Sequence, residues 1–203
     1  MARLAVAALL AALPAPPFHA RVETISPALR AHLRSWHRGC PVGLRDLRLL
    51  TLSYRGFDGR AHTGRLIVHR EAVRPVRRAL HVLYDHRFPI RRMRLVDDYG
   101  ASDDRSMAAD NTSAFNCRLA AGSRRWSEHA YGRAIDINPR ENPMLLAGHV
   151  EPPNGARFRD RSSRAPGVIH TGGVAVRAFA RVGWGWGGRW TSPDYQHFSA
   201  SGG

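Results

Sequence analysis

Two short stretches of the sequence combine histidine and aspartate at spacings that could serve a metal ion. In SEHAYGRAIDIN, His129 and Asp136 stand seven positions apart, with Gly132 between them. In one helix, residues seven apart would lie two turns from each other and would not be neighbours, which are three or four residues apart. Glycine permits a sharp change of direction, and residues 134–137 have the apolar pattern of a strand. A loop histidine and a strand aspartate could therefore converge from two directions.

The second stretch, DYQHF, places Asp194 three positions before His197. In an extended or turning segment, the histidine could hold a metal while the carboxylate lies beside metal-bound water. Catalytic zinc takes three nitrogen or oxygen ligands and keeps a position for water, whose pKa falls to about 7. A nearby carboxylate could take the water's proton. The residues alone leave a second interpretation open, with Asp136 as a buried carboxylate paired with an arginine and Asp194 as a turn former after Pro193.

The two blocks together resemble the zinc D-alanyl-D-alanine carboxypeptidase family, which includes vancomycin-resistance-type D,D-carboxypeptidases and dipeptidases and phage L-alanyl-D-glutamate endopeptidases. The resemblance covers roughly residues 90–198 and rests on Ser127-x-His129-x-x-Gly132-x-Ala134-x-Asp136-Ile137 and on Asp194-x-x-His197-Phe198, preceded by Trp186 and Gly187-Gly188-x-Trp190. It implies one zinc ion held by His129, Asp136 and His197. It also implies a metal-activated water that hydrolyses peptide bonds in peptidoglycan stem peptides.

The resemblance suggests roles for further side chains. Asp194 takes the place of the catalytic acid and base, where many relatives carry the longer glutamate. Arg118 best matches the arginine that holds the substrate carbonyl or carboxylate, with a surface arginine as the alternative. Ser127 could orient substrate or a ligand, or be a turn serine, while Trp186 and Trp190 could wall the cleft or pack in the core. Further candidates to line the cleft, with no role assigned, are Asp103, Asp104 and Asn116.

The helices and strands expected along the sequence must position these residues. Their mixture predicts an α+β fold, with a small, mostly antiparallel sheet flanked by helices. Helical spacing of apolar residues predicts helices from about residue 26 to before Gly39, from about 74 to before Pro89, around 106–108, and over 174–182. Strand-forming residues predict strands over 47–54, 65–69, 90–96, 115–118 and 134–137 and a short apolar strand at the end of the tail, the first two joined as a hairpin. Residues 140–168 are rich in Pro, Gly, Asn and Arg, which predicts a long excursion between elements.

The N-terminus and the cysteines predict export. Residues 1–20 combine a basic start with an apolar run too short to span a bilayer, as in a signal peptide cleaved near Ala20 or Ala15. Residues 21–203 then form one zinc-peptidase-like domain with its catalytic core at about 90–198, and no other segment is apolar and long enough to cross a membrane. Cys40 and Cys117 are expected to form one disulfide, with two buried free thiols as the alternative.

The formal net charge is +15, and every basic residue apart from histidine is arginine. A field this positive favours anionic partners such as wall polymers, nucleic acid or membrane surfaces. The arginines are spread along the chain, which favours a solvated surface over a dedicated nucleic-acid site. We therefore expect a monomeric, secreted or envelope-associated zinc peptidase acting on peptidoglycan peptides. A wall-peptide binding module without activity and a basic nucleic-acid binder stay open, as does the choice between carboxypeptidase and endopeptidase.

Overall fold

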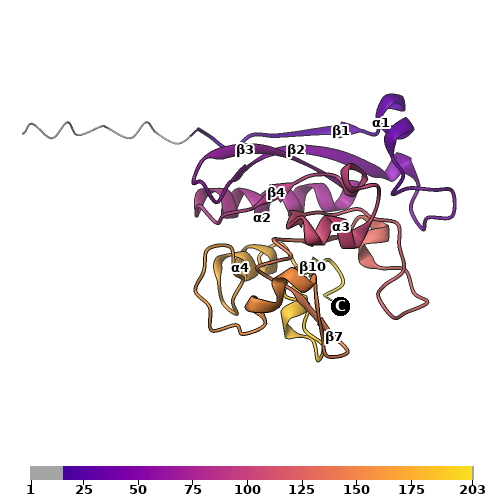
Figure 1. Cartoon of the computed structure of the whole chain (residues 1–203). Helices are drawn as coiled ribbons and strands as arrows, with labels where there is room; N and C mark the ends of the chain where they lie inside the picture. The colour runs from indigo at the N-terminus through magenta and orange to yellow at the C-terminus, as the bar shows by residue number, and fades with distance from the viewer. Residues whose placement is uncertain (1–15, 203) are drawn as a thin grey trace, which may run out of the picture.

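The computed structural model describes residues 16–202 (Figure 1). Within this range the chain forms two antiparallel three-stranded sheets, one parallel strand pair, one antiparallel hairpin and four α-helices. The predicted α+β class is confirmed. Two of the candidate metal-binding residues, Asp136 and His197, lie in the second sheet and not in the first.

The first sheet has the order β1-β2-β3 and contains the predicted hairpin, which turns at residues 56–59. Its strands are β1 (Ala20–Thr24), β2 (Leu47–Arg55) and β3 (Ala61–His69). Alternate apolar residues of β2 and β3, among them Leu50, Leu52, Leu66 and Val68, are buried in one cluster with the apolar face of α2 (Val73–Asp85). The alternating pattern of the strands and the helical spacing of α2 thus meet in one core.

The second layer holds the sheet β6-β10-β9 and the helix α4 (Val174–Ala180). Figure 1 shows β1–β3 along the top, α2 beneath them, and α4 and β10 beneath α2. Phe179 of α4 stacks on Phe198 with ring centroids 4.2 Å apart, and both rings are fully buried. The second sheet's strands are β6 (Ala134–Asp136), β9 (Gly185–Trp186) and β10 (His197–Ser199).

Smaller elements complete the fold. The helices α1 (Pro27–His32) and α3 (Asp103–Ala108) are both short, and β4 (Arg92–Met93) pairs in parallel with β5 (Asn111–Thr112). The hairpin consists of β7 (Met144–Leu146) and β8 (His149–Glu151). The 3-10 turns are η1 (Leu44–Asp46), η2 (Arg70–Ala72), η3 (Val96–Tyr99), η4 (Glu128–Tyr131), η5 (Pro153–Phe158) and η6 (Gly187–Arg189).

Three expected elements are shorter than predicted or absent. The first helix ends at His32 because Asp97 accepts hydrogen bonds from the backbone N–H groups of Arg34 and Ser35, at 2.6 and 2.8 Å, and draws them away from a helical path. The predicted strand over 90–96 pairs only at Arg92–Met93. The segment 115–118 joins no strand, because its N–H groups bond to carbonyls of several separate segments.

The excursion over residues 140–168 is ordered around two side chains, the buried Asn142 and the half-buried Arg161. The Asn142 amide donates to the carbonyls of Ile137, Asn138 and Gly167. The Arg161 guanidinium donates to the carbonyls of Glu141, Phe158 and Ile169, at 2.8–3.0 Å. Both side chains donate to backbone carbonyls that have no partner in a sheet. They therefore hold together the parts of this segment that lie outside regular secondary structure.

The predicted disulfide is present and joins Cys40 to Cys117, with Cα atoms 5.8 Å apart. Within residues 16–202, no helix combines the length and the apolar character that a membrane span requires. Most of the predicted leader, residues 1–15, lies outside the described residues. Phe18 stacks on His81 and Ala20 pairs with Leu52, so cleavage at Ala20 would remove contacts that cleavage at Ala15 would keep.

Asp110 and Glu141 form a buried carboxylate pair beside two arginines. Arg140 Nη2 lies 2.6 Å from Glu141 Oε1, and Arg91 Nε lies 3.4 Å from Asp110 Oδ2. Asp110 Oδ2 and Glu141 Oε2 are nevertheless buried without a hydrogen-bond partner among the described residues. Burial, and then the adjacent Glu141 carboxyl, raise the pKa of Asp110 to about 7.

Asp110→Asn is expected to stabilise the fold at about pH 8 by about 1–3 kcal/mol. With its raised pKa, Asp110 supports folding fully below about pH 4, and this support is lost as the pH rises through about 7. Asparagine carries no charge that must be buried. Its amide oxygen can still accept the hydrogen bond that the Arg140 backbone N–H group donates to Asp110 Oδ1 at 3.1 Å. Urea unfolding of both proteins at several pH values measures the difference.

The exposed Asp85, paired with His81 at 3.4 Å, supplies a matched control. Asp85→Asn is expected to change the unfolding free energy by less than about 0.5 kcal/mol, because exposed pairs contribute little. The interpretation of the Asp110 pair is wrong if Asp110→Asn shifts stability equally at acid and at alkaline pH.

Candidate metal centre

His129 lies in the 3-10 turn η4, which local sequence defines at both ends. Ser127 caps the turn, and its Oγ accepts a hydrogen bond from the His129 N–H group at 3.3 Å. Gly132 ends the turn with φ +67°, and a Cβ there would lie 2.6 Å from the backbone nitrogen of His69. Both the left-handed conformation and the close approach require glycine. The chain then reverses directly into β6.

Asp136 and His197 come from neighbouring antiparallel strands. They face each other directly in the register of β6 and β10. Residues directly opposite in such a pair present their side chains on the same face of the sheet. Strand pairing therefore brings together two side chains 61 positions apart in the sequence.

The three predicted ligands form one compact, buried group. His129 Nε2 lies 3.1 Å from Asp136 Oδ2, and His197 Nδ1 lies 3.1 Å from Asp136 Oδ1. The two imidazole nitrogens are 3.2 Å apart. His129 Nδ1 donates to the Ala114 carbonyl at 2.5 Å, which leaves the Nε2 lone pair for a metal.

The pKa values of His129 and Asp136 depend on each other. Burial opposes the charged form of His129, but the Asp136 carboxylate outweighs it and raises the His129 pKa. Burial likewise opposes ionised Asp136, yet His129 and His197 lower the Asp136 pKa below its ordinary value. An ionised carboxylate is thus held between two imidazoles.

The donor set fits zinc. Two imidazole nitrogens and one carboxylate oxygen are ligand types that zinc takes in catalytic sites, which keep a fourth position for water. The candidate ligand atoms of His129, Asp136 and His197 all lie within 4.8 Å of one another. The Ala114 carbonyl supplies the outer hydrogen bond that commonly orients a histidine ligand.

Asp194 is half-buried near this group. Its N–H group donates to the Gly187 carbonyl at 3.0 Å, and it forms an isolated antiparallel bridge with Met144 at the start of β7. Oδ1 has no hydrogen-bond partner among the described residues. Burial, and then the charge of Asp136, raise the pKa of Asp194 to about 7. A carboxyl group with this pKa can both accept and return a proton near neutral pH.

Arg118 lies close enough for its positive charge to act on Asp194 and His129. It partly opposes the rise in the pKa of each, which has the larger causes given above. Its Nη2 is 2.8 Å from Asp103 Oδ2, and Asp103 Oδ1 accepts from the Asn116 amide at 3.2 Å. Asp103 therefore holds the guanidinium in place while itself being fixed by Asn116. Asp104 is exposed and has no comparable bond among the described contacts.

The other predicted side chains differ in position. Ser127 is a buried cap of η4. Trp190 lies against the site, its ring centroid 5.2 Å from that of His197. Trp186 is buried in the core, where its indole N–H donates to the Tyr195 carbonyl at 2.9 Å.

Three supporting features escaped prediction. The Ala114 carbonyl and the Asp103–Arg118 pair depend on tertiary contacts that leave no local pattern. Arg161 lies over the Tyr195 ring, 4.3 Å from its centroid, and so ties the 140–168 segment to the residue after Asp194. The only sequence signal for Arg161 is its place in an arginine-rich stretch, which does not distinguish it from exposed arginines.

Comparison with known proteins identifies the same segment. Neither curated proteins nor solved structures give a significant match to this chain. A family model described as D-alanyl-D-alanine carboxypeptidase matches residues 121–200, the segment that carries His129, Asp136, Asp194 and His197. Over residues 121–200 the chain is therefore similar to the D-alanyl-D-alanine carboxypeptidase family, which bears out the predicted resemblance for this segment.

Proposed function

We propose that this protein is a zinc-dependent peptidase that hydrolyses peptide bonds in peptidoglycan stem peptides. The observation that carries the proposal is the convergence of His129, Asp136 and His197 within 4.8 Å, in the segment that matches a peptidase family. Asp194 Oδ1, which is buried without a hydrogen-bond partner among the described residues, adds the proton acceptor that hydrolysis needs.

Held by His129, Asp136 and His197, zinc would polarise the scissile carbonyl and activate water. Asp194 then takes the proton from the attacking water and returns it to the leaving amine. Its pKa of about 7 suits both directions of transfer. Arg118, fixed by Asp103, stabilises the negative charge that develops on the carbonyl oxygen. Trp190 forms a wall of the cleft, beside His197.

The proposed location is outside the cytoplasm. A disulfide between Cys40 and Cys117 is typical of oxidising compartments, and peptidoglycan lies there as well. The net charge of +15 would hold a monomeric enzyme near anionic wall polymers. Two of the arginines are not free to bind nucleic acid, because the buried Arg55 and the half-buried Arg161 lie over aromatic rings.

The deciding experiment measures zinc and products together. Purified full-length protein is analysed for metal and incubated with peptidoglycan and with soluble stem peptides, and the products are identified by mass spectrometry. We expect one zinc per chain and cleaved peptides. Loss of a single terminal D-alanine would indicate a carboxypeptidase, and internal cleavage an endopeptidase. Absence of both zinc and product would overturn the proposal, and retention of peptides without cleavage would favour a binding module.

Arg118→Ala is expected to lower kcat by about 100-fold, because it removes a donor to the developing oxyanion. Zinc content should not change, since Arg118 is not among the proposed ligands. Steady-state kinetics with metal analysis measure both quantities. The matched control is Arg125→Ala, an exposed arginine in the same connection, which should keep full activity. Equal kcat values for Arg118→Ala and wild type would remove Arg118 from the mechanism.

A further inference from the structure

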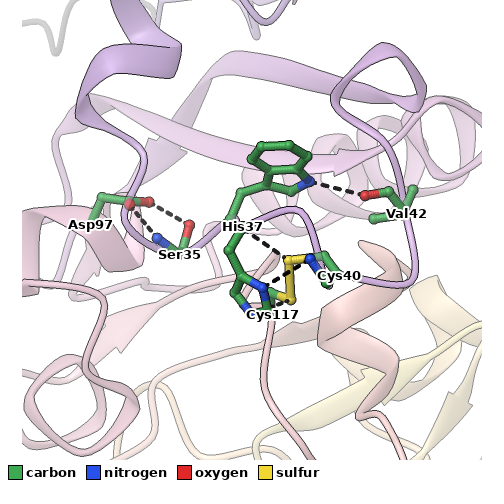
Figure 2. The surroundings of a disulfide bond; sticks show 8 residues. Ser35, His37, Cys40, Val42, Asp97 and Cys117 are labelled. Carbon is green, nitrogen blue, oxygen red and sulfur yellow. Dashed lines mark hydrogen bonds between the residues drawn. A yellow bond between two sulfur atoms is a disulfide. The ribbon is translucent and has the colours of Figure 1, made fainter.

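The Cys40–Cys117 disulfide joins the N-terminal segment to the chain that leads into Arg118 (Figure 2). Both cysteines are half-buried, so the bond is neither sealed in the core nor fully exposed. The Cys117 N–H group also bonds to the Ser35 carbonyl at 3.1 Å, and Ser35 is in turn held by Asp97. The bridge therefore connects two segments that other bonds already keep side by side.

His37 supplies a hydrogen-bond donor to each sulfur. Its backbone N–H donates to Cys40 Sγ at 3.1 Å, and its Nε2 lies 3.5 Å from Cys117 Sγ. The Gly39 N–H group donates to His37 Nδ1 at 3.1 Å, so Nδ1 is an acceptor and the ring proton resides on Nε2. Nε2–H is then the group that faces Cys117. In this tautomer Nε2 carries the proton and offers no lone pair to a metal.

Donors to sulfur matter most after the bond opens. A disulfide sulfur is a weak acceptor, whereas a thiolate carries a full charge and accepts strongly. A donor already in place therefore stabilises the reduced form more than the oxidised form. It also makes its sulfur a better leaving group in thiol exchange.

We propose that Cys40–Cys117 is an exchangeable redox site that reacts with an external dithiol. A thiolate of the dithiol attacks Cys40 Sγ, and the Cys40–Cys117 bond breaks with its electron pair passing to Cys117 Sγ, beside His37 Nε2–H. The second thiol of the dithiol, as thiolate, attacks the mixed disulfide and releases Cys40 as thiolate, beside the His37 N–H group. The dithiol is oxidised to a disulfide, and the cysteine pair takes up two electrons, with protons following as the thiolates equilibrate with solvent.

Opening the bridge removes the covalent tie next to Arg118. The segment keeps its hydrogen bonds, including those from Phe115 N–H to the Ile67 carbonyl and from Ser127 N–H to the Arg118 carbonyl. We expect reduction to loosen Arg118 without releasing metal, because none of the candidate ligands lies in the bridged segments. This consequence rests on the proposed peptidase function, whereas the exchange reaction itself does not.

The test measures the bridge directly in folded full-length protein. Native protein is incubated with dithiothreitol, and in parallel with reduced and oxidised glutathione in several ratios, and free thiols are counted by alkylation and mass spectrometry. We expect the wild-type bridge to open without denaturant. His37→Ala should open about tenfold more slowly and require a more reducing glutathione ratio, because its thiolate at Cys117 lacks a donor.

Two further variants separate the donor from general effects. His32→Ala, another exposed histidine in the preceding helix, should behave as wild type. His37→Gln, which again offers an N–H group, should recover part of the lost rate. The proposal is overturned if the wild-type bridge opens only in denaturant, or if His37→Ala opens as fast as wild type. Peptidase activity enters neither readout, so an inactive protein leaves the result intact.

Discussion

Asp194→Asn is expected to lower kcat by about 100- to 10,000-fold, the range associated with loss of a general acid or base. Asparagine has nearly the same shape but cannot accept the proton of the attacking water. The zinc content should stay at that of the wild type, because Asp194 is not in the candidate ligand group. Turnover of a stem peptide and metal analysis of the same preparation measure the two effects.

The exposed Asp160, which bonds only to Ser162 in its own turn, provides the matched substitution. Asp160→Asn should leave kcat unchanged. If Asp194→Asn kept more than about a tenth of wild-type kcat, another group would have to be the base. If it lost both activity and zinc, Asp194 would belong to the metal site instead.

His129→Ala is expected to abolish zinc binding and the stabilisation that zinc brings. A ligand that binds only the folded state at a thousandfold excess over its Kd adds about 4 kcal/mol to the unfolding free energy. Wild-type protein should therefore unfold at a higher temperature with zinc than with a chelator, and His129→Ala should unfold at one temperature in both. Thermal unfolding with metal analysis measures this.

His149→Ala removes an exposed histidine at the β7–β8 hairpin and serves as the control. It should show the full zinc-dependent shift. A His129→Ala protein that still bound one zinc and kept that shift would place the metal elsewhere. Similar unfolding of wild type with zinc and with chelator would show that zinc does not bind the folded protein tightly.

Local periodicity was enough to predict the elements that make the core. The hairpin of β2 and β3 alternates apolar and polar residues, and α2 and α4 repeat apolar residues at helical spacing. These signals come from burial on one face, which the sequence records directly. The class of the fold followed from them.

The elements that were not predicted correctly depend on contacts with residues far away in the sequence. The first helix ends early because of Asp97, more than sixty residues away. Residues 140–168 contain a hairpin and a 3-10 turn arranged around Asn142 and Arg161, whose bonds reach carbonyls in separate segments. No local pattern records which carbonyl a buried side chain will meet.

The site divides in the same way. The family resemblance of the two motif blocks implied three ligands, and the fold brings these side chains within 4.8 Å of one another. The orientation of His129 depends on the Ala114 carbonyl, and that of Arg118 depends on Asp103; neither contact has a sequence signature. The convergence of the candidate ligands was therefore predictable, whereas the groups that orient the side chains were not.

The close contact at Gly132 joins the segment that resembles the family to a part of the chain outside it. The matched segment begins at residue 121, yet the Gly132 carbonyl accepts its bond from His69 at the end of β3, at 2.8 Å. Two further supports lie outside that segment. They are Ala114, whose carbonyl orients His129, and α2, on which α4 packs. A fragment cut at residue 120 would keep every candidate ligand and lose the surfaces that hold them. The segment that resembles the family is thus smaller than the set of elements that support the candidate ligands, and moving residues 121–200 alone into another protein would leave those supports behind.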